Sequence, residues 1–387
     1  MIMKYRVKQK IFFFIALFSL LLAHTAVGDI SIYQIERGSE SDPDSYEYHN
    51  YDSMTQLLFN ISEQYSEIVH LESIGETFEK RSIWMMKISD NPRQDEGEPG
   101  VLLMGAHHGN EKPSYESLIF FLKQIVEFYY NEDSDNDGDG IKNEDDFDGI
   151  DNDHDGFIDE DPSEERIQSL IKETEIFVIP MVNPDGVEFN WRKNRAPNYG
   201  SFGTAEDITS YGVDLNRNYG YLWYLPFIKP LKYMLPFIII DQSWNYRGEH
   251  AFSELETQAI RDFVVSHDNI KISLSYHSYS EVILYPWMHT SLETKDEKMF
   301  ITIGENISKI DGYKLMKHGW AGREYLIPRF GGTIGTSENW LYASQGIFSF
   351  TMELCKTRCP TESEVVFDYC WKHVGVNLYI AEKSLQL

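Results

Sequence analysis

Short apolar segments that alternate with segments of helical periodicity constrain the fold of this chain most strongly. Strand-like runs cover residues 82–88, 101–104, 175–181, 271–276 and 347–352. Apolar residues recur at helical spacing over residues 51–70, 118–130 and 255–266. Apolar strands separated by helices form a largely parallel sheet that is covered on both faces. The sequence therefore predicts an α/β protein with ligand-binding groups at the carboxyl ends of the strands.

Five polar motifs lie between and after these segments. They are His108-Gly109-Asn110-Glu111, Trp191-Arg192-Lys193-Asn194-Arg195, Asp214-Leu215-Asn216-Arg217-Asn218, His277-Ser278-Tyr279-Ser280 and Phe350-Thr351-Met352-Glu353-Leu354. Together they supply two imidazoles and a carboxylate for a metal, a second carboxylate for a base, and arginines for an anion. Hydrolysis of a peptide bond next to a free carboxylate requires this inventory.

The first and fourth motifs can form a zinc site. A catalytic zinc usually takes three protein ligands, and two histidines with one glutamate are a standard set. His108 and Glu111 are a short-spaced pair, which His277 can complete because it also follows a buried strand. His107 is the alternative ligand, although it would leave Glu111 at a different offset. Asp214 can accept the other N–H of a ligand imidazole, or it can cap a helix or turn.

The remaining motifs suit the other tasks of amide hydrolysis. Glu353 lies among apolar residues that would raise its pKa by desolvation, which suits the base that moves a proton from water to the leaving amine. Arg217, between two asparagines, suits a terminal carboxylate because its guanidinium matches that group with two hydrogen bonds. Arg192 suits the oxyanion at the attacked carbonyl, where one donor is worth roughly 3 kcal/mol.

These motifs resemble those of the zinc metallocarboxypeptidases, the family of carboxypeptidases A, B and T and of the regulatory carboxypeptidases. Carboxypeptidase A is a reference example of the two-histidine, one-glutamate site. The similarity runs from Tyr48 to about Cys355. It also includes the segments Asn183-Pro184-Asp185-Gly186, Tyr246-Arg247-Gly248, Ala251-Phe252-Ser253-Glu254 and Leu284-Tyr285-Pro286.

The resemblance implies a fold and a role for each site residue. The fold is an α/β/α sandwich around a mixed, largely parallel eight-stranded sheet. The resemblance assigns zinc binding to His108, Glu111 and His277, general base catalysis to Glu353, transition-state stabilisation to Arg192, and anchoring of the substrate carboxylate to Asn216 and Arg217.

The chain departs from the family at the position of the capping tyrosine. At the base of the specificity pocket, its residue indicates which C-terminal residues we expect it to prefer. Family members carry a mobile capping tyrosine where this chain has Phe330-Gly331-Gly332, and the nearest tyrosine is Tyr325. Glu338 matches the family position at the base of the pocket for the last side chain of the substrate. The residue at that position is apolar in the A-type branch and acidic in the B-type branch. We therefore expect a preference for C-terminal Lys or Arg, or a mixed preference.

Two other functions share these residues. Deacylases and cell-wall peptide hydrolases of the same family have the metal site but act on other substrates. The retention of Arg192, Asn216 and Arg217 argues against a deacylase. The other hypothesis is a non-catalytic, calcium-binding surface module on an inactive peptidase scaffold. The intact Glu353 argues against it.

The first 28 residues are typical of an export signal. Basic residues precede the apolar run 11–23, and small residues follow it. The run is shorter than the ~20 residues of a spanning helix, so we expect cleavage and a secreted or surface-released protein without a stable membrane span. Residues 29–47 are a polar extension and residues 48–387 the catalytic domain.

An acidic insertion at residues 131–165 carries most of the net charge of −28. It contains 17 Asp or Glu and one Lys, a net charge of −16, which leaves −12 for the rest of the chain. Nucleic acid is therefore a poor partner. Alternate aspartates around glycines resemble aspartate-rich calcium repeats, although a disordered acidic loop would share the composition. The candidate calcium ligands are Asp135, Asp137, Asp139, Asp151, Asp153, Asp155 and Asp159.

A second insertion, residues 222–245, is apolar and rich in proline. Three prolines argue against a continuous helix and two lysines against a membrane span. A hydrophobic flap packed on its own domain is the simpler interpretation, and contact with a membrane or a partner is the alternative.

We predict that chelation of calcium with EGTA lowers the melting temperature without removing zinc, because calcium would stiffen the acidic insertion. Differential scanning calorimetry with parallel zinc analysis measures both quantities. An unchanged melting temperature would mean that the insertion holds no structural calcium.

Overall fold

The computed structural model describes residues 46–130, 164–196, 212–223, 245–317 and 333–387. The chain divides into two compact units, Met1–Glu47 and Tyr48–Leu387, and the second holds every helix and strand described below. The export segment, the seven candidate calcium ligands, the core of the apolar insertion and Tyr325 lie outside the described residues. No helix among the described residues is long and apolar enough to cross a membrane.

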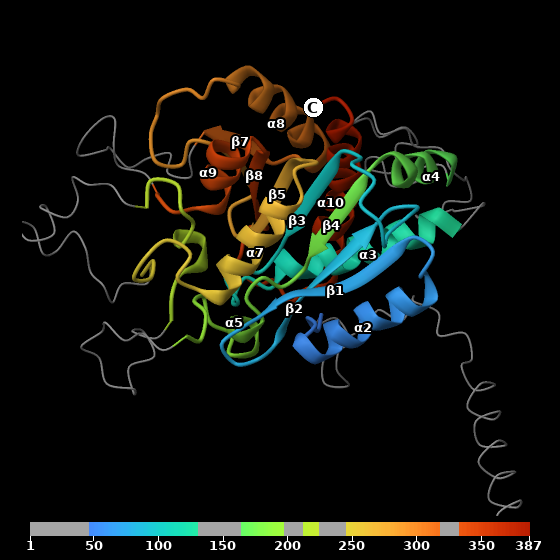
Figure 1. Cartoon of the computed structure of the whole chain (residues 1–387), viewed down its shortest axis with the longest axis horizontal. Helices are drawn as coiled ribbons and strands as arrows, with labels where there is room; N and C mark the ends of the chain where they lie inside the picture. The colour runs from blue at the N-terminus through green and yellow to red at the C-terminus, as the bar shows by residue number, and fades with distance from the viewer. Residues whose placement is uncertain (1–45, 131–163, 197–211, 224–244, 318–332) are drawn as a thin grey trace, which may run out of the picture. The chain divides into compact units, whose positions relative to one another are not determined.

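The second unit contains a single mixed sheet of eight strands in the order β1-β2-β4-β3-β5-β8-β6-β7 (Figure 1). The strands are β1 Val69–Glu76, β2 Ser82–Ile88, β3 Gly100–Met104, β4 Glu175–Ile179, β5 Ile270–Ser278, β6 Val282–Tyr285, β7 Lys314–Lys317 and β8 Phe348–Leu354. The central strands β4, β3, β5 and β8 are parallel neighbours. Their carboxyl ends therefore meet at one edge, as the sequence predicts.

Helices cover both faces of this sheet. They are α2 Tyr51–Gln64, α3 Pro113–Tyr130, α4 Glu164–Glu173, α5 Pro184–Glu188, α7 Leu255–Ser266, α8 Glu297–Asp311, α9 Ser337–Trp340 and α10 Ser363–Ser384, with a 3-10 turn Leu215–Arg217 and a π-turn Leu341–Gln345. Helix α7 packs on one face, where Ile260 and Phe263 meet Leu102 and Phe177. Across the other face the hydroxyl of Tyr276 donates to Asn377 of α10 at 2.6 Å.

The α/β/α sandwich predicted from the sequence is confirmed, with corrections at element boundaries. The segment 51–70 is not one helix: α2 ends at Gln64, the chain turns at Tyr65, and Val69 begins β1. Helix α3 begins at Pro113, five residues before the predicted start. Proline suits the first turn of a helix because its missing N–H needs no partner there.

The register of β5 and β8 places the predicted catalytic side chains on one face. His277 pairs with Glu353, and Ser275 pairs with Thr351 two residues earlier on each strand. Because side chains alternate along a strand, these four lie on the face that α7 covers. The three cysteines form no disulfide; Cys355 and Cys370 are buried and Cys359 is half-buried.

Candidate active site

The strand β3 ends at Met104, and the loop that follows carries the first motif. Gly109 of this loop lies against Gly186 of α5, and a Cβ on Gly109 would come within 2.0 Å of the Gly186 carbonyl carbon. Only glycine permits that approach. Asn183 caps α5 by accepting from the Gly186 N–H at 2.9 Å and also donates to the His107 carbonyl. The Asn183–Gly186 segment therefore supports the loop that holds His108 and Glu111.

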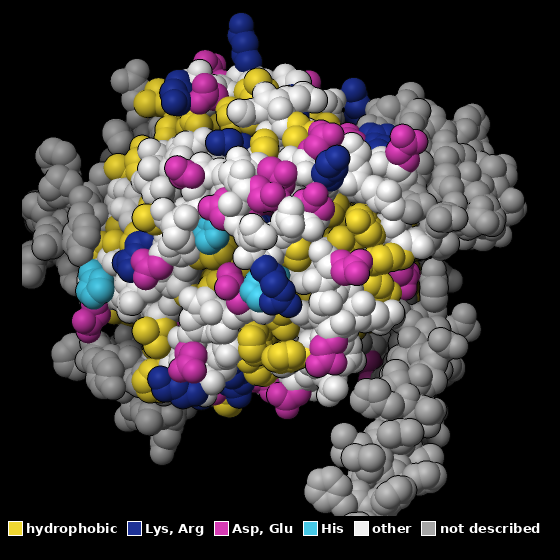
Figure 2. All heavy atoms as spheres, turned by 45° about the vertical axis from the view of Figure 1, so that its right-hand side comes forward, with side chains coloured by type: hydrophobic (Ala, Val, Ile, Leu, Met, Phe, Trp, Pro, Cys, Tyr) yellow, Lys and Arg dark blue, Asp and Glu magenta, His cyan; other side chains and the backbone are white. Residues whose placement is uncertain are grey.

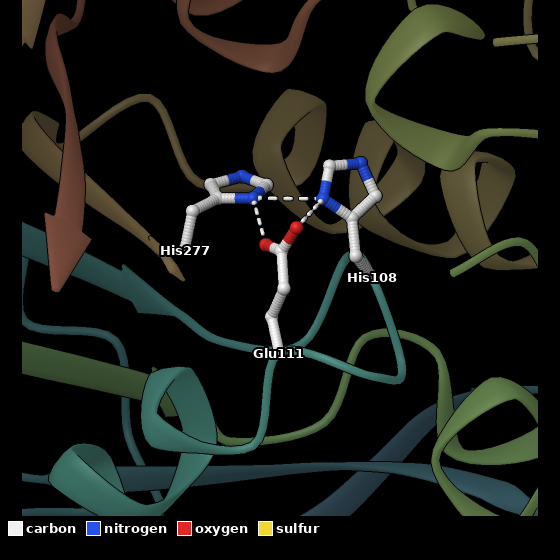
Figure 3. A group of neighbouring side chains, drawn as sticks. All are labelled: His108, Glu111 and His277. Carbon is white, nitrogen blue, oxygen red and sulfur yellow. Dashed lines mark hydrogen bonds and ion pairs between the residues drawn. The ribbon is translucent and has the colours of Figure 1, made fainter. Parts of the chain in front are cut away.

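His108, Glu111 and His277 converge on one point (Figure 3). Nδ1 of His108 lies 2.9 Å from Oε1 of Glu111, and Nδ1 of His277 lies 2.9 Å from Oε2. The two Nδ1 atoms are 3.1 Å apart. Ligand atoms around a tetrahedral zinc lie about 3.3 Å apart, given zinc–nitrogen bonds of ~2.0–2.1 Å. All three side chains are buried, and the donor set fits zinc.

The outer nitrogen of each imidazole has its own partner. Nε2 of His108 lies 3.0 Å from Oδ1 of Asp214, and Nε2 of His277 lies 3.3 Å from the Ser275 hydroxyl. A proton on the outer nitrogen leaves the Nδ1 lone pair directed at the centre. His107 points elsewhere, since its Nε2 lies 2.8 Å from the Tyr219 hydroxyl. Among the described residues, the histidines and carboxylate that could hold a metal at this centre are therefore His108, Glu111 and His277, without His107.

Arg192 enters the same centre from a separate segment. Its Nε and Nη2 donate to Oδ2 of Asp214 at 3.1 and 2.9 Å, and its Nη1 donates to Oε1 of Glu111 at 3.3 Å. Burial alone would raise the pKa of Asp214, but the guanidinium groups of Arg192 and Arg217 lower it well below its usual range. Asp214 is therefore an ionised carboxylate that orients both His108 and Arg192.

Glu353 lies on β8 beside His277, and its pKa is strongly shifted. Burial, and then the charge of Glu111, raise that pKa to about 8. The direction agrees with the desolvation expected from the apolar residues around it in the sequence. A divalent cation at the adjacent centre would favour the ionised form.

Arg217 and Asn216 lie next to Glu338. Among the described residues the Arg217 guanidinium makes one hydrogen bond, from Nη1 to the carbonyl of Asn216 at 2.6 Å. Oδ1 of Asn216 accepts from the Ser337 N–H at 2.8 Å, which ties the 3-10 turn to α9. Glu338 is fully buried, and burial raises its pKa. Its Oε1 has no hydrogen-bond partner in the described part of the chain.

The structure thus brings all eight sequence-predicted zinc, catalytic and substrate residues, with Asp214, to one edge of the sheet. Sequence reasoning missed the supporting residues Asn183, Ser275, Asn194, Glu254 and Glu256. The motifs that contain Asn183 and Glu254 were visible as non-catalytic similarity, but their contacts were not.

Comparisons with known proteins agree with this geometry. A sequence profile of a family described as "Zinc carboxypeptidase" matches residues 54–366. A zinc carboxypeptidase of Saccharothrix mutabilis subsp. capreolus is 26% identical over 344 residues, which are 85% of this chain and 67% of that protein. Mouse carboxypeptidase A1 is 28% identical over 321 residues, 80% of this chain. The chain spans 63% of the length of the mouse protein.

Solved structures show the same fold. Bovine thrombin-activatable fibrinolysis inhibitor, in complex with tick carboxypeptidase inhibitor, has a TM-score of 0.64 at 20% identity; the match covers 88% of this chain and 98% of that chain. Carboxypeptidase A of Helicoverpa armigera has a TM-score of 0.62 at 20% identity, covering 87% of this chain and 74% of that chain.

We predict that Asp214→Asn weakens zinc binding by about 10- to 100-fold, because the amide no longer holds the His108 N–H and the Arg192 guanidinium with a negative charge. Competition with a chromophoric chelator measures the affinity. Asp262→Asn, which changes an exposed carboxylate paired with Arg261, is the matched control. Equal zinc affinity in both variants would contradict the assigned role of Asp214.

Proposed function

Because this chain belongs to the zinc carboxypeptidase family, we propose that it removes C-terminal amino acids from peptides or proteins with zinc held by His108, Glu111 and His277. The observation that carries the proposal is the convergence of these three side chains within 2.9–3.1 Å of one another beside Glu353 and two arginines. The metal centre, an ionisable base and a cationic anion site then serve one reaction.

Zinc, when bound there, supplies Lewis acidity toward water and the substrate carbonyl. Glu353 takes the proton from the attacking water and returns it to the leaving nitrogen. Arg192 donates to the oxygen of the attacked carbonyl as negative charge develops on it. Asp214 holds that guanidinium with two hydrogen bonds, so Arg192 needs little reorganisation during the reaction.

Arg217 is suited to bind the C-terminal carboxylate of the substrate. Its side chain is half-buried, and in the described residues its guanidinium has no salt bridge and one hydrogen bond, to a backbone carbonyl. A charge in that situation favours an anionic ligand, and the guanidinium fork matches a carboxylate. Asn216 lies beside it and contributes an amide Nδ2, which also lies 3.3 Å from Nε2 of His277.

The side chain of the last substrate residue would meet a polar surface. Within the described ranges, the buried oxygens that lack a hydrogen-bond partner include Oε1 of Glu338 and the hydroxyls of Ser273, Ser349 and Thr351, the last three on the same sheet face as His277. Buried polar atoms without partners are uncommon, so a polar or cationic ligand would satisfy them. These atoms support a preference for C-terminal Lys or Arg, or a mixed preference.

The protein is proposed to act outside the cytoplasm, because residues 1–28 are typical of a cleaved export signal. Calcium in the acidic insertion is proposed from its aspartate spacing alone. Its partners are peptides with a free C-terminus. On the face shown in Figure 2, acidic and basic side chains of the described residues are interspersed, with no continuous basic patch among them.

We expect wild type loaded with zinc to release the last residue from blocked dipeptides that end in Lys or Phe. Glu353→Gln should lower kcat by about 10²- to 10⁴-fold, because the amide cannot carry the proton. Zinc content serves as the control, since Glu353 is not among the ligands. Turnover of acylated amino acids but not of dipeptides would favour a deacylase, and zinc binding without turnover would favour a non-catalytic module.

We predict that Glu338→Ile raises the ratio of Phe release to Lys release by about tenfold or more, because the pocket loses a buried carboxylate that a cationic side chain can reach. The ratio of kcat/KM values for the two dipeptides measures it. Glu338→Gln, of nearly the same size, separates charge from volume. An unchanged ratio in Glu338→Ile would remove Glu338 from the specificity pocket.

A further inference from the structure

Asn194 lies two residues after Arg192 and is fully buried. Its backbone N–H donates to the Val213 carbonyl at 3.0 Å, and its Oδ1 accepts from the Val213 N–H at 2.8 Å. Its Nδ2 donates to Oε2 of Glu254 at 2.8 Å and to Oε2 of Glu256 at 3.1 Å. Asn194 therefore joins the segment that carries Arg192 to the residue before Asp214 and to the start of α7.

The packing around this amide leaves little freedom. A Cβ on Gly212, whose φ is +77°, would lie 2.0 Å from the Asn194 carbonyl oxygen. Asn218 makes the corresponding connection from the segment with Asp214 and Arg217: its Nδ2 donates to the Ser253 hydroxyl at 2.8 Å and its Oδ1 accepts from the Thr257 hydroxyl at 2.6 Å. Residues 253–257 thus hold both arginine-bearing segments.

The two carboxyl groups around Asn194 are not equivalent. Oε1 of Glu254 accepts from the Ser253 hydroxyl at 2.6 Å and Oε2 accepts from Asn194, so both carboxylate oxygens of Glu254 act as acceptors. Oε1 of Glu256 is buried without a partner among the described residues. Burial, and the nearby charge of Glu254, raise the pKa of Glu256 to about 8. At neutral pH Glu256 therefore carries a proton, and Glu254 supplies the acceptor that Asn194 needs.

We propose that Asn194 and Glu254 are positioning residues for Arg192, with Glu256 as the third member of their network. The proposal deepens the proposed function and depends on it for its kinetic readout. Neither residue touches the substrate in this scheme. They fix the backbone from which Arg192 reaches Asp214, so their loss lowers transition-state stabilisation rather than substrate binding.

The two glutamates allow a matched test, because the same substitution has different expected results. Glu254→Gln places an amide donor against Nδ2 of Asn194 or against the Ser253 hydroxyl. Glu256→Gln is isosteric with the protonated carboxyl and keeps an acceptor for Asn194. Glu382→Gln removes a surface ion pair with Arg166 on another helix. It is the control for replacing a glutamate with glutamine at a position away from the site.

We expect Glu254→Gln to lower kcat by about tenfold with KM changed by less than about twofold, and Glu256→Gln to stay within about threefold of wild type. In an Arg192→Ala background, Glu254→Gln should lower kcat by less than about twofold, because the guanidinium that Glu254 positions is absent. Equal losses in the two glutamate variants, or an undiminished loss without Arg192, would overturn the proposal.

Crystal structures of the two variants provide a readout that needs no turnover. We expect the guanidinium of Arg192 to leave Asp214 in Glu254→Gln and to keep both hydrogen bonds in Glu256→Gln. Wild type without carboxypeptidase activity would refute the proposed function, while these structures would still decide the positioning role. Arg192 in its wild-type place in both variants would refute that role. If Glu254→Gln does not fold, Asn194→Ser, which removes the amide donor, replaces it in every measurement.

Discussion

The site depends on one buried anion, the carboxylate of Asp214. A carboxylate without access to water is stable only when donors surround it. Here one oxygen faces the His108 imidazole, and the other accepts two hydrogen bonds from Arg192. The same charge therefore directs a metal ligand and a cation toward a common centre. An imidazole and a guanidinium on segments more than eighty residues apart, the proposed metal ligand and anion-binding group, are held in one geometry by a single side chain.

The central part of the fold could be predicted from the sequence for a physical reason. Parallel strands buried on both faces have continuous apolar runs, and their ends meet at one edge. His108 and His277 follow such runs, and Glu353 lies at the end of another, so their proximity followed from topology. The edge strands β1 and β7 and the strand β6 lack this signal, because β1 is half-exposed and includes Glu72 and Gly75, and β6 and β7 have four residues each.

Helices were harder to delimit than strands. Ile68 continues the apolar spacing of α2 although the chain has already turned, because that side chain packs at the start of β1. Helix α10 was not recognised, since apolar residues are buried on most of its sides and no single stripe stands out. Helix α8 carries Phe300, Ile303 and Ile307 at regular spacing, so closer reading of that pattern could have found it.

Supporting contacts of the site were beyond sequence reasoning, because they join residues that are far apart in the chain. Asn194 and Glu254 each lie in a motif that the sequence shows, but they are sixty positions apart and nothing in the sequence indicates that they meet. The zinc ligands can be recognised because their chemistry is unusual, whereas an asparagine that accepts and donates four hydrogen bonds resembles any other asparagine. Residue type predicts the reacting groups, and only tertiary structure reveals what holds them.

The contact between Gly109 and Gly186 has a consequence for reading sequence variation in this protein. The two backbones leave no space for a methyl group on Gly109, and a Cβ on Gly186 would come within 2.4 Å of Nδ2 of Asn183. Because that amide donates to the His107 carbonyl, a larger residue at Gly186 disturbs the support of the loop that bears His108 and Glu111. Damage at this turn, seventy residues from the ligands, would then look biochemically like a metal-binding defect. The phenotype of a variant at this position depends on which backbone segments lie in contact. The distance along the chain between the variant and the ligands does not predict it.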